Sequence, residues 1–331
     1  MALPLSLFRK LAQSAPTEAW TAIFEYVWQM CSPTLSPATA ASEVTRRDRH
    51  IAAIDLFLAT TGWDLWSLFE ESIEHTAHAL VNWWNTQTSG RAVLILDALS
   101  LREVPWLLHS AQARGYTVHT AKATAAELPA DTTPFAKALG FSQRSSLENN
   151  GAGAAHRLPG TKTECVGMPW ADCAKLIGAE PHWVLWHHWP DNRIHDLSAA
   201  GKGLELLTQE VAAQLTDEAF WLLIERLTTG RRLVITSDHG YAASGLFPDT
   251  VDDQAKYLRE RFKSGRWSPA IDDGSSWVPP VDLTIASRHG RNGYALGRRK
   301  WKSQGGYPTL THGGLSVLEV AAPFIELSRM E

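Results

Sequence analysis

Acidic and histidine side chains follow several apolar stretches of this sequence, in an order that suits metal binding. Six residues are of this kind: Asp97, Asp191, His195, Asp238, His239 and His312. Carboxylate oxygens and imidazole nitrogens are ligands that zinc and manganese accept. Three of these residues also have a structural interpretation. Asp97 could cap a helix, Asp191 could form a turn after Pro190, and His312 could be an ordinary loop histidine. Their number and order together indicate a metal site.

A hydroxyl group with a suitable setting lies between the first and second of these stretches. In LPADTTPFAKALG, Thr132 and Thr133 stand directly before Pro134, which is typical of the first turn of a helix. Asp131 or Thr133 could simply cap that helix. The same geometry also places a hydroxyl beside unpaired backbone N–H groups, which attract an anionic phosphate. This segment is therefore a candidate for the nucleophile of phosphoryl transfer.

The elements that must position these residues alternate along the second part of the chain. Short apolar runs such as RAVLILD, YTVHTAK, HWVLWHHW and RRLVITS read as strands, and amphipathic segments between them read as helices. This alternation predicts an α/β fold with a mainly parallel sheet between layers of helices. Ligands of such sheets bind beyond the carboxyl ends of the strands, where the candidate residues lie.

The first part of the chain has a helical pattern instead. Apolar residues recur three and four positions apart over residues 16–84, with a break at Pro33 and Pro37. We therefore predict an N-terminal helical region over residues 1–88 and a catalytic domain over residues 89–331. The spacing of the tryptophans in the helical region favours packing over ligand stacking; these are Trp63, Trp66, Trp83 and Trp84.

The ordered set LILD, LPADTTP, PDNRIH, TSDHG and THGGLS resembles the alkaline-phosphatase superfamily. VITSDHG and THGGLSVLEVAAPF look most like its PglZ branch, which is associated with bacterial phage-defence systems; the resemblance covers residues 90–331. It implies two metal sites and a nucleophile. The ligands of one ion would be Asp97, Asp238 and His239, and those of the other Asp191, His195 and His312. The nucleophile would be Thr132, which stands two positions before a Pro, as the family's nucleophile does. Relatives often have Gly where this chain has Ala98, and PglZ proteins are commonly much longer.

The resemblance also implies a reaction, hydrolysis of a phosphate ester through a phosphothreonine intermediate with two divalent ions. The Asp and His ligand types favour zinc first and manganese second. Six cations between Asp282 and Glu319 suit a nucleotide or nucleic acid, with Tyr294 and Trp301 for stacking, but they also suit a solvated basic face with two core aromatics. The cations are Arg288, Arg291, Arg298, Arg299, Lys300 and Lys302. A phosphodiesterase is the first expectation and a phosphomonoesterase the second; a non-catalytic scaffold that binds other proteins of a defence complex is a third.

Composition sets the outer limits of these hypotheses. The 331 residues are 44% hydrophobic, enough for a sizeable core, and the net charge of -4 argues against a general nucleic-acid coat. The three cysteines have no CxxC spacing and suit free thiols in a reducing cytoplasm. The N-terminal stretch lacks the order of a signal peptide, and no apolar run approaches the roughly 20 residues that span a bilayer. We therefore expect a cytoplasmic protein without a membrane segment.

Overall fold

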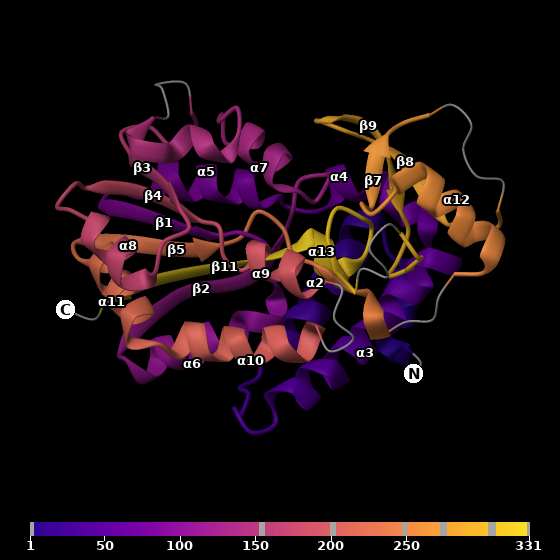
Figure 1. Cartoon of the computed structure of the whole chain (residues 1–331), viewed down its shortest axis with the longest axis horizontal. Helices are drawn as coiled ribbons and strands as arrows, with labels where there is room; N and C mark the ends of the chain where they lie inside the picture. The colour runs from indigo at the N-terminus through magenta and orange to yellow at the C-terminus, as the bar shows by residue number, and fades with distance from the viewer. Residues whose placement is uncertain are drawn as a thin grey trace.

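Six strands form the central sheet of the chain (Figure 1), in the order β2-β11-β5-β1-β4-β3. The computed structural model describes residues 3–151, 156–198, 203–246, 250–271, 277–303 and 309–329. In sheet order the strands are Tyr116–Ala125, Ala321–Arg329, Arg231–Thr236, Gly90–Leu96, His182–His187 and Lys162–Val166. Strands β5, β1, β4 and β3 are parallel, while β11 is antiparallel to both β2 and β5. The predicted mainly parallel sheet is confirmed.

The sheet is buried on both faces because its central strands are apolar throughout. Along β1, Leu94 and Leu96 belong to one core, whereas Val93 and Ile95 belong to the other. The first core packs under α6 (Val104–Ala113), α8 (Trp170–Leu176), α10 (Gly203–Thr216) and α11 (Glu218–Thr228). The second packs under α5 (Thr76–Thr86) and α7 (Thr132–Ala138), which Figure 1 shows on the opposite side of the sheet from α6 and α10.

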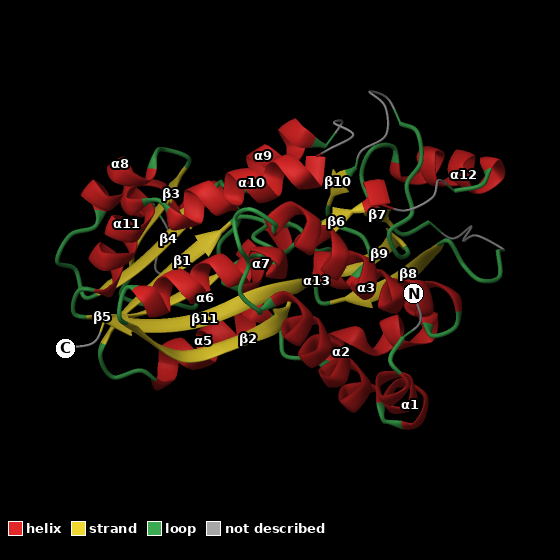
Figure 2. Ribbon diagram, turned by 90° about the horizontal axis from the view of Figure 1, so that it is seen from below, coloured by secondary structure: helices red, strands yellow, loops and turns green. Residues whose placement is uncertain are grey.

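The N-terminal helices lie beyond one end of the sheet (Figure 2) and share the first core with it. They are α1 (Leu5–Gln13), α2 (Pro16–Cys31), α3 (Ala40–Thr60) and α4 (Phe69–Ser72), with a 3₁₀ turn at Trp63–Leu68. Trp66 is fully buried against Trp20, with ring centroids 4.8 Å apart, and Trp83 and Trp84 are buried on α5. These tryptophans pack, as their helical spacing predicts. The division at residue 88 stays a prediction.

A second, small sheet stands at the same end and was not predicted from the sequence. Its order is β7-β9-β8, over Trp267–Pro269, Gly290–Ala295 and Asp282–Ser287, with α12 (Asp252–Phe262) beside it. Two short strands, β6 (Ala242–Ala243) and β10 (Leu310–Thr311), form an antiparallel pair, and His312 directly follows β10. The remaining short elements are 3₁₀ turns at Leu101–Glu103, Arg144–Asn150 and Ser244–Leu246, and helices α9 (Asp191–Leu197) and α13 (Val317–Val320). Among the described residues, no helix is both long and apolar enough to cross a membrane.

Candidate metal centre and nucleophile

Three adjacent parallel strands deliver acidic side chains to one edge of the sheet. Ile95 of β1 pairs with Thr236 of β5, so Asp97 and Asp238, two positions later, meet where these strands end. The neighbouring strand β4 leads to Asp191, whose backbone N–H donates to the Asp97 carbonyl at 3.0 Å. The parallel register therefore brings together carboxylates that are far apart in sequence.

Asp97, Asp238 and His239 form the first group, and all three are fully buried. One ligand atom from each lies within 4.8 Å of the others. His239 Nε2 is 3.8 Å from Asp97 Oδ1 and 3.5 Å from Asp238 Oδ2. His239 Nδ1 donates to the Gly240 carbonyl at 2.9 Å, which orients Nε2 toward the two carboxylates. A side chain at Gly240 would collide with the Leu318 carbonyl oxygen, so the close approach of this turn requires glycine.

The buried charges of this first group shift one another's pKa values. Burial opposes the charged form of His239, but the carboxylates of Asp238, Asp97 and Asp191 outweigh burial and raise its pKa to about 9. Burial, with Asp238 and Asp191 nearby, raises the pKa of Asp97 well above its ordinary value. A bound cation would offset the repulsion among these buried carboxylates.

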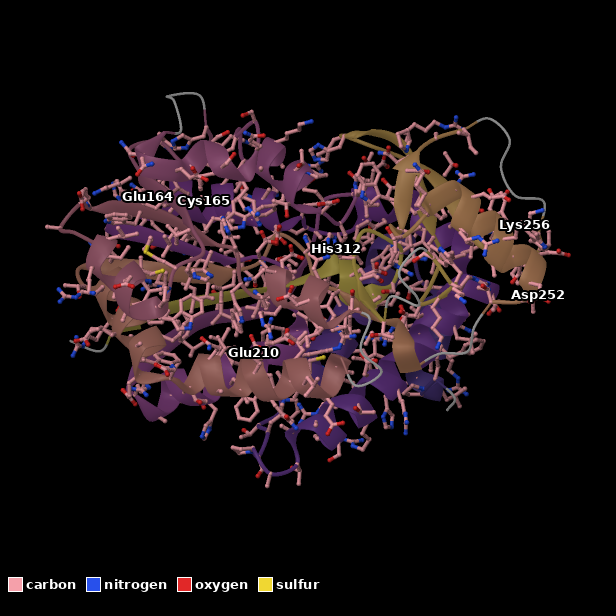
Figure 3. All side chains as sticks on the ribbon, viewed as in Figure 1. Glu164, Cys165, Glu210, Asp252, Lys256 and His312 are labelled. Atoms are coloured by element: carbon pink, nitrogen blue, oxygen red, sulfur yellow. The ribbon has the colours of Figure 1, made fainter. Side chains whose placement is uncertain are left out.

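Asp191, His195 and His312 form the second group. Asp191 begins α9 and His195 follows one turn later, with His195 Nε2 3.4 Å from Asp191 Oδ2. His312, directly after β10, places Nε2 3.5 Å from Asp191 Oδ1. Figure 3 shows His312 near the middle of the molecule, where the two sheets approach each other. His195 is the open member of the group, because 64% of its side chain is exposed.

Two further histidines precede Asp191 and point elsewhere. His187 Nε2 donates to the Met168 carbonyl at 2.9 Å, and its Nδ1 accepts from the Trp189 backbone at 3.0 Å. His188 Nε2 lies 3.2 Å from Cys165 Sγ. The geometry thus selects His195 as the histidine that accompanies Asp191 and His312.

The two groups are contiguous, and their donor atoms fit divalent ions. The rings of His239 and His312 stack with centroids 4.3 Å apart. Four buried atoms in these groups make no hydrogen bond to any described residue: Asp191 Oδ1, Asp238 Oδ2, His239 Nε2 and His312 Nδ1. Unpaired buried polar atoms are costly, and a metal ion would satisfy them.

Thr132 faces this centre and Thr133 does not. The Thr132 hydroxyl donates to Asp97 Oδ1 at 3.4 Å, and the residue is half-buried, whereas Thr133 is exposed. Asp131 caps α7 by accepting from the Thr132 backbone N–H at 2.8 Å. Its other oxygen accepts from Trp267 Nε1 at 3.0 Å, so β7 of the small sheet holds the turn that carries Thr132.

Two site residues escaped the sequence analysis. Asp131, considered only as a cap, also lies within 4.8 Å of His239 and His312 and could join either ion. Arg144, in a 3₁₀ turn, places its guanidinium on Asp97 Oδ2. The position of Asp131 beside Thr132 was a usable signal, whereas SQRSSLENN around Arg144 has no pattern that points to the site.

Helix α3 supports the turns behind both groups with two buried carboxylates. Asp55 Oδ1 accepts from the Val317 backbone N–H at 2.7 Å, five residues after His312, and Oδ2 accepts from Arg298 Nε at 2.6 Å. Asp48 pairs with Arg298 and with Arg102, whose Nη1 donates to the Tyr241 carbonyl at 2.8 Å. The N-terminal region therefore contacts the segments next to His239 and His312.

In the basic stretch before His312, residues 288–302, some side chains are exposed and others are buried. Arg298 is buried in the ion pairs with α3, and Tyr294 and Trp301 are core residues. Of the two interpretations of these aromatic side chains, the structure supports packing. Arg291 remains exposed, and Arg288 is 44% exposed beside Glu70 and Glu127.

Neither a protein-family model nor a curated protein matches the sequence. Among solved structures, the chain is similar to murine ectonucleotide pyrophosphatase/phosphodiesterase 5, with a TM-score of 0.43, 14% identity and coverage of 72% of this chain and 87% of that one. The human protein of the same name gives a TM-score of 0.43 at 12% identity, with the same coverage. An inactive variant of the murine protein in complex with AMP gives 0.33 at 14% identity, covering 48% of this chain and 52% of that one.

Proposed function

We propose that this chain is a metal-dependent phosphohydrolase of the alkaline-phosphatase superfamily, with its activity in residues 89–331. One observation carries the proposal: buried Asp and His donors without hydrogen-bond partners converge beside a hydroxyl that contacts one of them. The convergence of four such atoms on one place favours a bound cation over separate structural caps or loop histidines. The PglZ branch and the setting in phage defence are supported by the motif resemblance.

We place two divalent ions, zinc or alternatively manganese, in the two groups. Asp97, Asp238 and His239 would hold one ion, and Asp191, His195 and His312 the other. Bound ions of this charge polarise phosphoryl oxygens and favour the alkoxide form of a neighbouring hydroxyl. Imidazole and carboxylate ligands suit zinc, and manganese accepts the same carboxylates.

The protein's own contribution is a positioned nucleophile. Asp131 fixes the backbone of Thr132, and Asp97 accepts a hydrogen bond from the Thr132 hydroxyl. Together they hold the Thr132 Oγ1 atom beside the metal-binding residues. After the proton leaves to solvent, Oγ1 bonds to phosphorus while the bond to the departing ester oxygen breaks and that oxygen is protonated. Water then attacks phosphorus, breaks the Oγ1–phosphorus bond and restores the threonine.

The charges around the site favour a phosphodiester over a phosphomonoester. Four carboxylates line the centre: Asp97, Asp131, Asp191 and Asp238. Their four negative charges equal the four positive charges of two divalent ions, and the Thr132 alkoxide balances the Arg144 guanidinium, so the loaded site is neutral. A diester adds one negative charge to this site and a monoester up to two, so the diester is the less costly substrate. Nucleotides and nucleic acids are the phosphodiester class that we propose as substrate.

The proposal is tested by hydrolysis of bis(p-nitrophenyl) phosphate and p-nitrophenyl phosphate by zinc- or manganese-loaded protein. Thr132→Ala should lose at least about a thousand-fold in kcat, because the covalent route is removed. Thr133→Ala, an exposed neighbour, is the matched control and should stay within about two-fold. Acid quenching and mass spectrometry should find a phosphate on the peptide that contains Thr132.

Two results would separate the alternatives. Faster turnover of the monoester than of the diester would make the chain a phosphomonoesterase with the same nucleophile. No turnover of either ester, in protein that binds metal stoichiometrically, would contradict the proposal and favour a scaffold subunit of a defence complex.

A further inference from the structure

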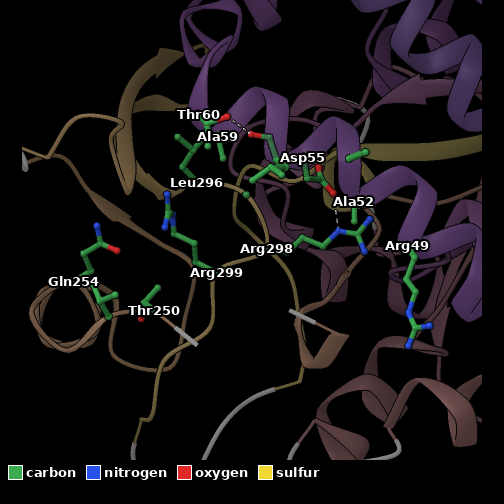
Figure 4. A pocket seen from close by; sticks show the side chains of 14 residues that line it. Arg49, Ala52, Asp55, Ala59, Thr60, Thr250, Gln254, Leu296, Arg298 and Arg299 are labelled. Atoms are coloured by element: carbon green, nitrogen blue, oxygen red, sulfur yellow. Dashed lines mark hydrogen bonds and ion pairs between the residues drawn. The ribbon is translucent and has the colours of Figure 1, made fainter. Parts of the chain in front are cut away.

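A cavity of about 460 Å³ lies away from the metal centre, between α3, the start of α12 and the segment 296–299. Figure 4 shows its two walls, with Ala52, Asp55 and Ala59 of α3 on one side and Thr250, Gln254 and Arg299 on the other. This volume falls in the range of pockets that bind small molecules. None of the candidate metal ligands lines it.

One wall of the cavity is largely aliphatic. Small side chains of α3 and Leu296 form one side, and no aromatic side chain is among its described lining residues. Leu56 and Val251 line the cavity while 62% and 66% exposed, respectively. Exposed aliphatic side chains that face a common hollow gain from an apolar ligand, and the absence of aromatic rings favours an aliphatic body over a planar one.

The charge of the lining is positive once internal pairs are removed. Asp55 is the one carboxylate among the described lining residues, and it is engaged by Arg298 and the Val317 backbone. Arg299 Nε is buried without a hydrogen-bond partner among the described residues, and a single long contact of 3.5 Å joins Arg299 Nη2 to the Pro280 carbonyl. Arg49, at the other end of the cavity, has no carboxylate partner within the described chain.

We propose that this cavity binds a small amphipathic anion, whose aliphatic chain lies along α3 and whose acid group pairs with Arg299. Arg299 offers the planar donor fork that carboxylates and phosphates accept, and a guanidinium whose Nε is buried and unpaired among the described residues gains from such a pair. Arg49 adds positive potential at the open end. Fatty carboxylates and alkyl phosphates share this chemistry. The proposal does not depend on the phosphohydrolase activity.

Calorimetric titration of the full chain tests it, with decanoate and decyl phosphate as probes, decanol and decyltrimethylammonium as controls, and all concentrations below micelle formation. We expect one molecule of at least one anion per chain, no detectable binding of the cation, and at least ten-fold weaker binding of decanol. The stronger of the two anions identifies the headgroup. Failure of both anions, or equal binding of the cation, would overturn the proposal.

Three variants locate the binding. Arg299→Gln should weaken the preferred anion at least ten-fold, because the charged hydrogen bonds are lost. Leu56→Asp, at an exposed position that tolerates a polar residue, should weaken it similarly by repelling the anion from the wall. Arg259→Gln on α12 is exposed and outside the cavity, and it should leave binding unchanged. Unchanged binding in folded Arg299→Gln and Leu56→Asp would place the ligand elsewhere and refute the site.

Discussion

Ala98 holds a left-handed backbone conformation directly after Asp97, with φ of 60°. The conformation aims its N–H at Asp238 Oδ1, 2.9 Å away, and so fixes the carboxylate of the first group. For a residue with a Cβ this conformation costs about 1–2 kcal/mol, and a β-branched residue suffers more. A glycine at this position would avoid the strain.

The effect of a substitution at Ala98 on stability should therefore depend on whether the new side chain is β-branched. Ala98→Gly should change the free energy of unfolding by less than about 1 kcal/mol, because relief of strain is opposed by the loss of a buried methyl group and by a more flexible unfolded chain. Ala98→Val should destabilise by about 2 kcal/mol or more, from strain and overpacking. Urea denaturation measures both. A well-tolerated valine would contradict the strained conformation.

At the residue scale, the sequence was informative where a motif joined residue type to position. Asp97, Asp238 and His239 follow strands whose apolar runs are unmistakable, so their convergence was predictable from the parallel order. Arg144 was not predictable, because it reaches Asp97 from a 3₁₀ turn across 47 residues of chain. Thr132 was preferred over Thr133 through resemblance, and the geometry now gives a separate reason, since Thr132 contacts Asp97.

At the scale of elements, β7 of the small sheet supports the turn before α7. Trp267 Nε1 donates a hydrogen bond to Asp131, whose other oxygen caps α7 by accepting from the Thr132 backbone N–H. Trp267→Phe keeps most of the ring packing but removes this donor, and we expect a loss of about 1 kcal/mol in stability. If Asp131 positions the nucleophile as proposed, kcat should fall about three- to ten-fold while KM changes little. Trp277→Phe, at a tryptophan that packs on Tyr257, is the matched control and should leave kcat unchanged.

Helix α3 makes a different contribution, through buried charge. Asp55→Asn would leave Arg298 short of a carboxylate and weaken the bond to the Val317 backbone, and we expect a loss of about 2–4 kcal/mol in the free energy of unfolding. Urea denaturation measures the loss. The exposed Asp64 provides the control, since Asp64→Asn should change stability by less than about 0.5 kcal/mol. Equal effects of the two substitutions would contradict a structural role for the ion pairs.

Periodicity predicted the long elements and failed for the small sheet. The central strands β1, β4 and β5 are continuous apolar runs, and the helices around them have a regular apolar face. In contrast, β9 is the segment GRNGYA, with two glycines and an arginine, and β8 alternates only weakly. Such strands depend on contacts with α12 and with the turn that carries Thr132, which no local pattern reveals.

At the scale of the whole molecule, charged groups from distant segments are buried together. Asp48 and Asp55 from α3, Arg102 after β1 and Arg298 after β9 form one ion-pair network. The sequence predicted a helical region and an α/β region, but it gave no sign of this link, because single charged residues on a helix usually face solvent. The sequence leaves open whether the basic stretch near His312 meets substrate or forms a solvated face, and its Arg298 does neither, because it pairs with Asp48 and Asp55 of α3.

Metal binding should stabilise the whole chain, and more strongly as the pH rises. Carboxylates and histidines bind metal in their deprotonated forms, so protons compete with the ion. Burial and neighbouring carboxylates raise the pKa of Asp97, and a raised carboxyl pKa removes stability from the metal-free protein as pH climbs above the unfolded value near 4. Zinc at about a hundred times its dissociation constant should add about 2.7 kcal/mol, or roughly 4 °C in Tm for a chain of 331 residues. Differential scanning fluorimetry with zinc or with EDTA should show a larger difference in Tm at pH 8 than at pH 5.5.

Asp238→Asn should abolish most of this Tm shift. A Tm shift that is equal at both pH values and is kept in Asp238→Asn would place the metal outside this centre.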